Sequence, residues 1–204
     1  MGLPNASPHH RSWPLLVAGV ILFLLAFAFD ARFTAWLTSD AVYPCVYPTL
    51  LTITQVAGVL ILIAVLADRF DGRMWLGCLA PILLTGLLTH AIKIMVGRTR
   101  PRVDLGAYHL EPFTIAPATA SFPSGHTSYA FAIVTLLCVY YPRWRPLFIL
   151  LGVCAGLERI ILREHYLSDV IAGAALGAGS VWLTMRLLGP RFYYRDAPPT
   201  LSRS

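Results

Sequence analysis

Charged residues are scarce in this chain. Only 13% of its 204 residues are Asp, Glu, Lys or Arg, about half the share found in soluble globular domains. Apolar residues make up 57%, so the composition predicts a membrane protein. The net charge of +6 does not indicate a nucleic-acid partner, because most of the cations lie in short loops between apolar runs and form no basic stripe.

Cysteine and clusters of metal-ligating residues are scarce as well. Cys45, Cys78, Cys138 and Cys154 form no C-x-x-C pair and lie beside no histidine cluster, so neither a zinc site nor a disulfide framework is indicated. We interpret them as small apolar residues of membrane helices. The sequence shows no carboxylate cluster for a metal, and we expect no cofactor.

Long apolar runs fill most of the chain. A helix needs about 20 residues to cross a bilayer, and runs of roughly this length occupy residues 13–29, 48–67, 74–96, 125–141, 146–162 and 166–188. Lipid does not tolerate unpaired backbone groups, and nothing alternates like a barrel strand. We therefore predict an all-α fold, an integral membrane bundle of six transmembrane helices. Residues 1–204 are expected to form a single membrane-embedded domain with a basic tail over 189–204.

The first apolar run has a second interpretation. His9, His10 and Arg11 precede it and the small-residue sequence Ala26-Phe27-Ala28 closes it, as in a signal peptide. An uncleaved first helix is favoured, and cleavage would leave five helices without disturbing the site described below.

The loop cations predict how the bundle is oriented. With both termini in the cytoplasm, nine arginines lie on the inner side and seven cations on the outer side, six of them within the motifs described below. Without those six, only Arg32 opposes the nine, which favours this orientation. The polar stretch 97–123 then faces the extracytoplasmic side.

Polar residues from distant segments converge at that outer end. A helix rises 1.5 Å per residue, so the third run starts near the inner boundary and reaches the outer one near Lys93. The fourth run begins there with Ser124-Gly125-His126, the fifth brings Arg159 back, and the sixth starts at His165. The hydropathy pattern alone therefore predicts one shared site.

The converging residues suit a phosphate group. Lys93, Arg100 and Arg159 are cations, and arginine binds phosphate through two parallel hydrogen bonds. Ser124 is expected to cap the fourth helix, and Gly125 lets a ligand approach the free N–H groups of that helix start. His165 and Asp169 are four residues apart on one helix face, where a carboxylate can orient an imidazole and stabilise its cationic form.

These residues occur in a familiar order. Lys93-x6-Arg100-Pro101, Pro123-Ser124-Gly125-His126 and Arg159-x5-His165-x3-Asp169 resemble the three motifs of the type-2 phosphatidic acid phosphatase family. The motifs span residues 93–169.

The resemblance implies a role for each residue. His165 would attack phosphorus and form a phosphohistidine, and Asp169 would orient it. His126 would protonate the leaving oxygen and then activate water. The phosphate oxygens would be held by a set of five residues, Lys93, Arg100, Ser124, Gly125 and Arg159, without a metal.

We therefore expect a metal-independent lipid phosphate phosphatase in the inner membrane of a bacterium. The resemblance suggests undecaprenyl diphosphate, phosphatidylglycerol phosphate, phosphatidic acid or a lipid A phosphate as substrate, and the sequence does not choose among them. One alternative is a phosphotransferase that passes the phosphoryl group to a lipid hydroxyl, and another is a non-catalytic lipid-binding or transport protein. The expected partners are the lipid substrate and membrane lipids, and the sequence does not indicate an oligomeric state.

Some charged residues beside the motifs remain open. Glu158 stands where the family usually has serine. It either faces away and pairs with a residue such as Arg163, or pairs with Lys93 or Arg159 and alters the choice of head group. Arg98, Arg102 and Arg163 could recognise a second phosphate or bind anionic lipid head groups.

Overall fold

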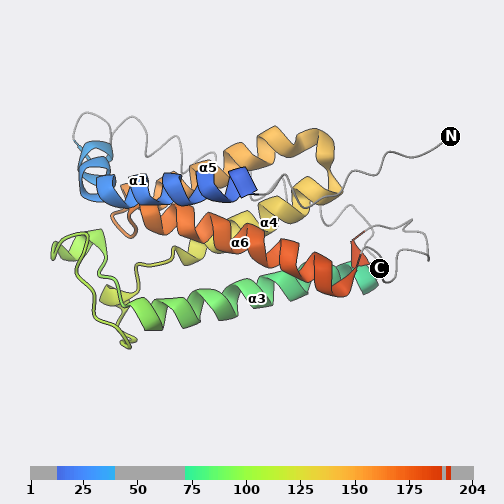
Figure 1. The fold of residues 1–204 in the computed structure, drawn as a ribbon, viewed down its shortest axis with the longest axis horizontal. Helices are drawn as coiled ribbons and strands as arrows, with labels where there is room; N and C mark the ends of the chain where they lie inside the picture. Colours follow the sequence, from blue (N-terminus) through green and yellow to red (C-terminus); the bar gives the residue numbers. More distant parts are fainter. Residues whose placement is uncertain (1–12, 40–71, 190–191, 194–204) are drawn as a thin grey trace.

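The computed structural model describes residues 13–39, 72–189 and 192–193. The predicted second helix, 48–67, lies outside the described residues. Five long helices are α1 (Trp13–Leu37), α3 (Gly72–Val96), α4 (Gly125–Tyr140), α5 (Arg145–Ile161) and α6 (Leu167–Leu188), joined in part by short 3₁₀ turns at Pro101–Val103, Pro117–Thr119 and Pro142–Trp144. In the described ranges no strand forms, and one isolated bridge pairs Arg98 with Leu110. The all-α prediction is confirmed (Figure 1).

The predicted bounds of the last four helices agree with the structure to within two residues. The predicted end of the first helix was wrong, because α1 continues eight residues past Phe29. The apolar run stops at Asp30, but the Asp30 side chain is fully buried and forms an ion pair with Arg98. A paired charge does not need water, so the helix continues through it.

Within the described residues, three helical segments are long and apolar enough to cross a membrane: Val17–Leu37, Leu76–Val96 and Leu167–Leu188. Helix α4 is apolar but has 16 residues. Helix α5 has 17 and carries Glu158 and Arg159 in its last turn. The motifs thus shorten the apolar part of these two helices, and the count of six spans stays a prediction.

Helix α6 lies at the centre of the bundle and packs against α1, α3, α4 and α5. Its contact with α4 is closest at two glycines one turn apart. A Cβ atom added to Gly173 would lie 2.6 Å from the Ser124 carbonyl oxygen, and one added to Gly177 would lie 2.1 Å from that of Ser128. Small residues at such positions let two membrane helices approach closely.

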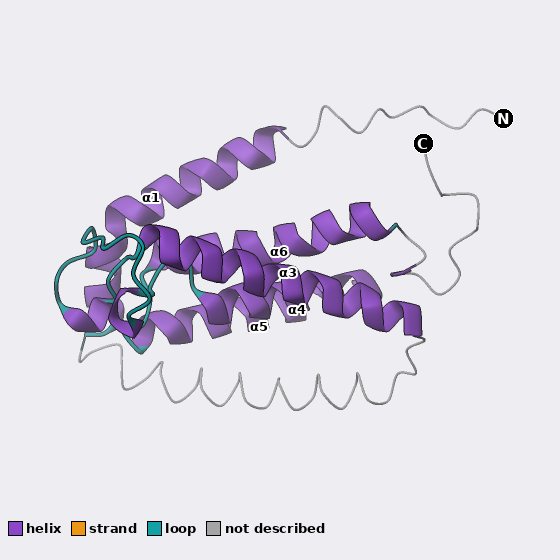
Figure 2. Cartoon of the chain, turned by 90° about the horizontal axis from the view of Figure 1, so that it is seen from below, coloured by secondary structure: helices purple, strands orange, loops and turns teal. Residues whose placement is uncertain are grey.

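The connections from α3 to α4 and from α5 to α6 lie at one end of the bundle, beside the end of α1 (Figures 1 and 2). The turn between α4 and α5 lies at the opposite end. All three motifs therefore meet at one end, as the helix-length argument predicted.

Candidate active site

The segment 97–124 begins with a tight turn that brings it back over the end of α3. Gly97 donates its N–H to the Lys93 carbonyl at 2.9 Å and has a φ of +58°. Only glycine fits there, because a Cβ would lie 1.7 Å from the carbonyl oxygen of Glu111 and the positive φ disfavours other residues. This turn directs the rest of the segment across the end of the bundle.

Lys93 lies between this segment and the start of α4. Its amine donates to the Ala120 carbonyl at 2.5 Å. A Cβ added to Gly125 would lie 3.8 Å from the Lys93 Cε atom. The first and second motifs are therefore in contact, although 32 positions separate these two residues in the sequence.

Ser124 caps α4, as predicted. Its hydroxyl oxygen accepts from the Thr127 backbone N–H at 3.5 Å, and its own N–H donates to the Asp169 carbonyl at 2.9 Å. The second bond attaches the start of α4 to the first turn of α6.

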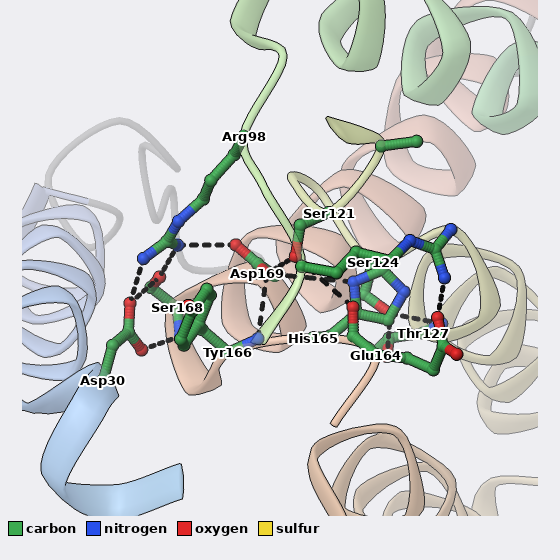
Figure 3. A network of polar contacts seen from close by, with 12 residues as sticks. Asp30, Arg98, Ser121, Ser124, Thr127, Glu164, His165, Tyr166, Ser168 and Asp169 are labelled. Atoms are coloured by element: carbon green, nitrogen blue, oxygen red, sulfur yellow. Dashed lines mark hydrogen bonds and ion pairs between the residues drawn. The ribbon is translucent and has the colours of Figure 1, made fainter. Parts of the chain in front are cut away.

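His165 is buried between α5 and α6, with 2% of its surface exposed. Its backbone N–H donates to the Arg159 carbonyl at 3.3 Å. Its Nδ1 atom lies 3.8 Å from the Asp169 Oδ2 atom, which is longer than a hydrogen bond. That oxygen already accepts from the Ser121 hydroxyl at 2.5 Å and the Tyr166 N–H at 2.9 Å. The predicted pair is therefore present, with Asp169 held from several sides (Figure 3).

Burial lowers the pKa of His165 to about 4, which outweighs the opposite effect of the Asp169 carboxylate. The cations Lys93 and Arg100 lower this pKa further. The imidazole is thus neutral at pH 7, with a free lone pair on one ring nitrogen.

Two arginines of the first and third motifs have buried donors. The Nε atoms of Arg100 and Arg159 have no hydrogen-bond acceptor among the residues that the structure describes. Arg100 also forms an ion pair with Glu164, which Arg102 shares at 3.3 Å. Buried donors of this kind are costly unless something accepts from them, so they suit an anion.

His126 lies in the first turn of α4 and is exposed. Four charged residues, Lys93, Arg100, Glu158 and Arg159, are close enough to interact with it electrostatically. His126 therefore stands at the open side of the same cluster, where it can exchange protons with water.

The charged residues beside the motifs, which the sequence left open, have different partners in the structure. Arg98 is 1% exposed and is paired with Asp30 and Asp169, so the hypothesis that it recognises a second phosphate was wrong. Arg163 pairs with Asp104 and also donates to the Pro101 carbonyl at 3.3 Å. Glu158 acts electrostatically on Arg159.

Three further residues contact the motif residues and were not predicted from the sequence: Asp30, Ser121 and Ser168. Only Asp30 carried a usable signal, since an ionisable residue at the edge of a membrane helix often has a functional partner. The two serines occupy positions that no local pattern singles out.

The sequence over residues 74–193 matches the PAP2 superfamily. The chain belongs to this superfamily. The resemblance that the three motifs indicated is thereby confirmed.

Relatives within the superfamily carry phosphatase names. A Rhizobium johnstonii protein named lipid A 1-phosphatase is 37% identical over 114 residues, which cover 54% of this chain and 47% of the relative. Lipid phosphate phosphatase 1 of Arabidopsis thaliana is 30% identical over 151 residues, covering 59% and 46%. The chain spans about half the length of these relatives.

A solved structure shares the fold. The crystal structure of Aquifex aeolicus LpxE superposes with a TM-score of 0.60 at 20% sequence identity, and the match covers 78% of this chain and 95% of that one. The helical bundle described above is therefore the fold of that protein as well.

Proposed function

We propose that this chain hydrolyses a lipid phosphate or diphosphate through a phosphohistidine formed on His165. One observation carries the proposal. A buried, neutral histidine lies among cations from three segments, and the Nε donors of Arg100 and Arg159 have no acceptor within the described residues. A phosphoryl group between them would satisfy both donors and lie beside the nucleophile.

In the first step, the Nε2 lone pair of His165 forms a bond to phosphorus. We assign Nε2 because Asp169 faces Nδ1. The bond from phosphorus to the lipid oxygen (or to the bridging oxygen of a diphosphate) breaks, and that oxygen takes a proton from the protonated, cationic form of His126. His165 is then a cationic phosphoimidazole, and the Asp169 carboxylate stabilises it.

In the second step, His126 takes a proton from water, and the water oxygen bonds to phosphorus. The P–N bond breaks and returns its electron pair to His165, so inorganic phosphate leaves and both histidines regain their starting forms. Lys93, Arg100 and Arg159 neutralise the phosphoryl oxygens in both steps. Stabilisation of this kind is usually the largest contribution to catalysis, and we propose no metal for it.

For the substrate, we propose a lipid whose phosphate enters from the outer leaflet while its chains stay in the bilayer. A lipid A phosphate is the first candidate, because the Rhizobium johnstonii relative carries that name. We propose that residues 1–204 act as one membrane domain, with the site on the extracytoplasmic side of a bacterial inner membrane.

The test is phosphate release by the purified protein in detergent with EDTA. The substrates are lipid A, undecaprenyl diphosphate, phosphatidylglycerol phosphate and phosphatidic acid. We expect release from at least one, and loss of release in His165→Ala. Arg100→Ala should lower kcat/KM about 100-fold, as removal of one oxyanion donor does in other enzymes. Arg102→Ala is the matched control, because its side chain is 50% exposed and shares the same Glu164, and its kcat/KM should stay within about threefold.

Other outcomes would point elsewhere. If His165→Ala released phosphate as fast as the original protein, the assignment of His165 as the nucleophile would be wrong. Transfer of phosphate only when a hydroxylated lipid is added would indicate a phosphotransferase. Folded protein that turns over none of the four lipids would indicate a binding or transport protein.

A further inference from the structure

A buried charge network lies behind Asp169, on the side away from His165 (Figure 3). Arg98 donates from Nη1 to Asp169 Oδ1 at 2.6 Å and from Nη2 to Asp30 Oδ2 at 2.8 Å. Ser168 joins them, since its hydroxyl accepts from Arg98 Nη1 at 2.7 Å and its N–H donates to Asp30 Oδ1 at 2.8 Å. Arg98 is 1% exposed, and both carboxylates are 0% exposed.

The network joins three parts of the chain. Asp30 comes from α1, Arg98 from the segment 97–124, and Asp169 from α6. The Arg98 guanidinium also donates from Nε and Nη2 to the Ala107 carbonyl at 2.8 and 2.6 Å, and it lies 4.3 Å from the centre of the Tyr166 ring. Its orientation is thus fixed from several directions.

The charges do not cancel within the network. With both carboxylates ionised, the two carboxylates and one guanidinium leave one net negative charge, which is buried and next to a neutral imidazole. Lys93 and Arg100 act electrostatically on Asp169 from outside the network, but a buried charge that is only partly compensated is still costly. During phosphoryl transfer His165 gains a positive charge, and the balance improves at that moment.

We infer that Asp30 and Arg98 are positioning residues for the phosphoryl transfer. Arg98 fixes the Asp169 carboxylate against His165, and Asp30 fixes Arg98 and supplies the net negative charge that stabilises the His165 cation. The inference rests on the proposed function, since it concerns the same nucleophile. It adds a residue of α1, outside all three motifs, to the determinants of the rate.

Two other charged residues act electrostatically on His165. They are Lys93 of α3 and Arg100 of the segment 97–124. Both are cations. The compensating negative charge at the Nδ1 side of His165 therefore comes from the Asp169 network.

The test compares Asp30→Asn with the unmodified protein. Asparagine keeps the size of the side chain and removes its charge. We expect kcat for the preferred lipid phosphate to fall at least about tenfold while KM changes by less than about threefold, because the charge acts mainly in the transition state. Vanadate, which mimics the five-coordinate phosphorus, should bind about tenfold more weakly, and inorganic phosphate should bind within about threefold of its original affinity.

Asp104→Asn is the matched control. Asp104 also pairs with an arginine at this end of the bundle, but its side chain is 70% exposed and its partner, Arg163, is 46% exposed. Exposed ion pairs contribute little, so kcat and vanadate affinity should stay as they are.

Two results would overturn the inference. In one, Asp30→Asn keeps kcat within about threefold of the original protein. In the other, kcat, phosphate affinity and vanadate affinity fall together with the melting temperature, which would mean a structural role only. An original protein that neither releases phosphate nor binds vanadate would instead remove the proposed function, and the inference with it.

Ser168→Ala decides the matter if Asp30→Asn does not fold. It keeps all three charges and removes the hydroxyl that bridges Asp30 and Arg98. We expect a fall in kcat of about threefold to tenfold with KM unchanged. An unchanged kcat in Ser168→Ala would contradict the inference.

Discussion

At the scale of single residues, burial determines which form of His165 the protein holds. The side chain is 2% exposed, and burial lowers its pKa to about 4, although the Asp169 carboxylate acts to raise this pKa. A nucleophile has to be deprotonated, so this environment keeps His165 ready at neutral pH without a separate base. Because folding lowers the pKa of His165, the free energy of unfolding also depends on pH.

The first prediction concerns acid stability. An unfolded histidine has a pKa near 6.5, so between about pH 6.5 and pH 4 the unfolded chain binds a proton that the folded protein does not. The free energy of unfolding therefore falls as the pH falls through this range, by about 1.4 kcal/mol per pH unit at most. Thermal unfolding in detergent at pH 7 and pH 5 measures this.

His165→Asn is the comparison, because it removes the titrating group and keeps a polar side chain of moderate size. The original protein should lose more of its melting temperature between pH 7 and pH 5 than the variant does. Equal losses would mean that other groups dominate the acid sensitivity and that His165 titrates near its ordinary pKa.

At the scale of helices, the α4–α6 contact holds the two halves of the site together. Ser124 caps helix α4, His126 lies in its first turn, and α6 carries Asp169 in its first turn. The glycines of α6 bring the two backbones close, and the Ser124 N–H bonds directly to the Asp169 carbonyl at 2.9 Å. A change in helix spacing should therefore reach the chemistry.

The second prediction uses two glycines of α6. Gly177→Val would place a Cβ 2.1 Å from the Ser128 carbonyl oxygen, whereas a Cβ at Gly179 meets nothing within 4 Å. We expect Gly177→Val to lower the unfolding free energy by about 1–3 kcal/mol, as overpacking does, and to lower phosphate release. Gly179→Val should keep its activity. Melting temperature and release rate measure both, and equal behaviour of the two variants would mean that α4 and α6 are not packed this closely.

Much of this arrangement could be predicted from the sequence. Helices α3 to α6 were placed to within two residues because glycine, proline and charged residues bound their apolar runs. Ser124 was identified as a helix cap because its side chain and position are typical of one. The convergence of run ends placed Lys93 and His165 at the same end of the bundle, as the structure has them, and their roles stay a prediction.

The part that could not be predicted depends on long-range pairing. Hydropathy treats a charged residue as the end of an apolar run, so α1 was ended before Asp30. It cannot show that Asp30 meets Arg98, 68 positions away, inside the protein. For the same reason the sequence left Arg98 open between a second phosphate and anionic lipid head groups, although its hydrogen bonds are used within the fold.

At the scale of the whole molecule, the two ends of the bundle carry different parts of the chain. One end holds the three motifs and the segment 97–124, and the other holds the short turn between α4 and α5. That turn carries Arg143 and Arg145, and short loops rich in arginine stay in the cytoplasm. The site end should therefore face outward, where lipid phosphates of the outer leaflet are within reach.

The last prediction tests this orientation with single cysteines, after the native ones are replaced. Ile115 lies in the segment 97–124 and is 86% exposed, and Trp144 lies in the turn between α4 and α5 and is 56% exposed. In intact cells a membrane-impermeant maleimide should label Ile115→Cys, because the predicted orientation places that side chain outside. Trp144→Cys should react only after the membrane is permeabilised, which also controls for its intrinsic reactivity. The reverse pattern would place the phosphate site in the cytoplasm, so that the substrate would have to come from the inner leaflet.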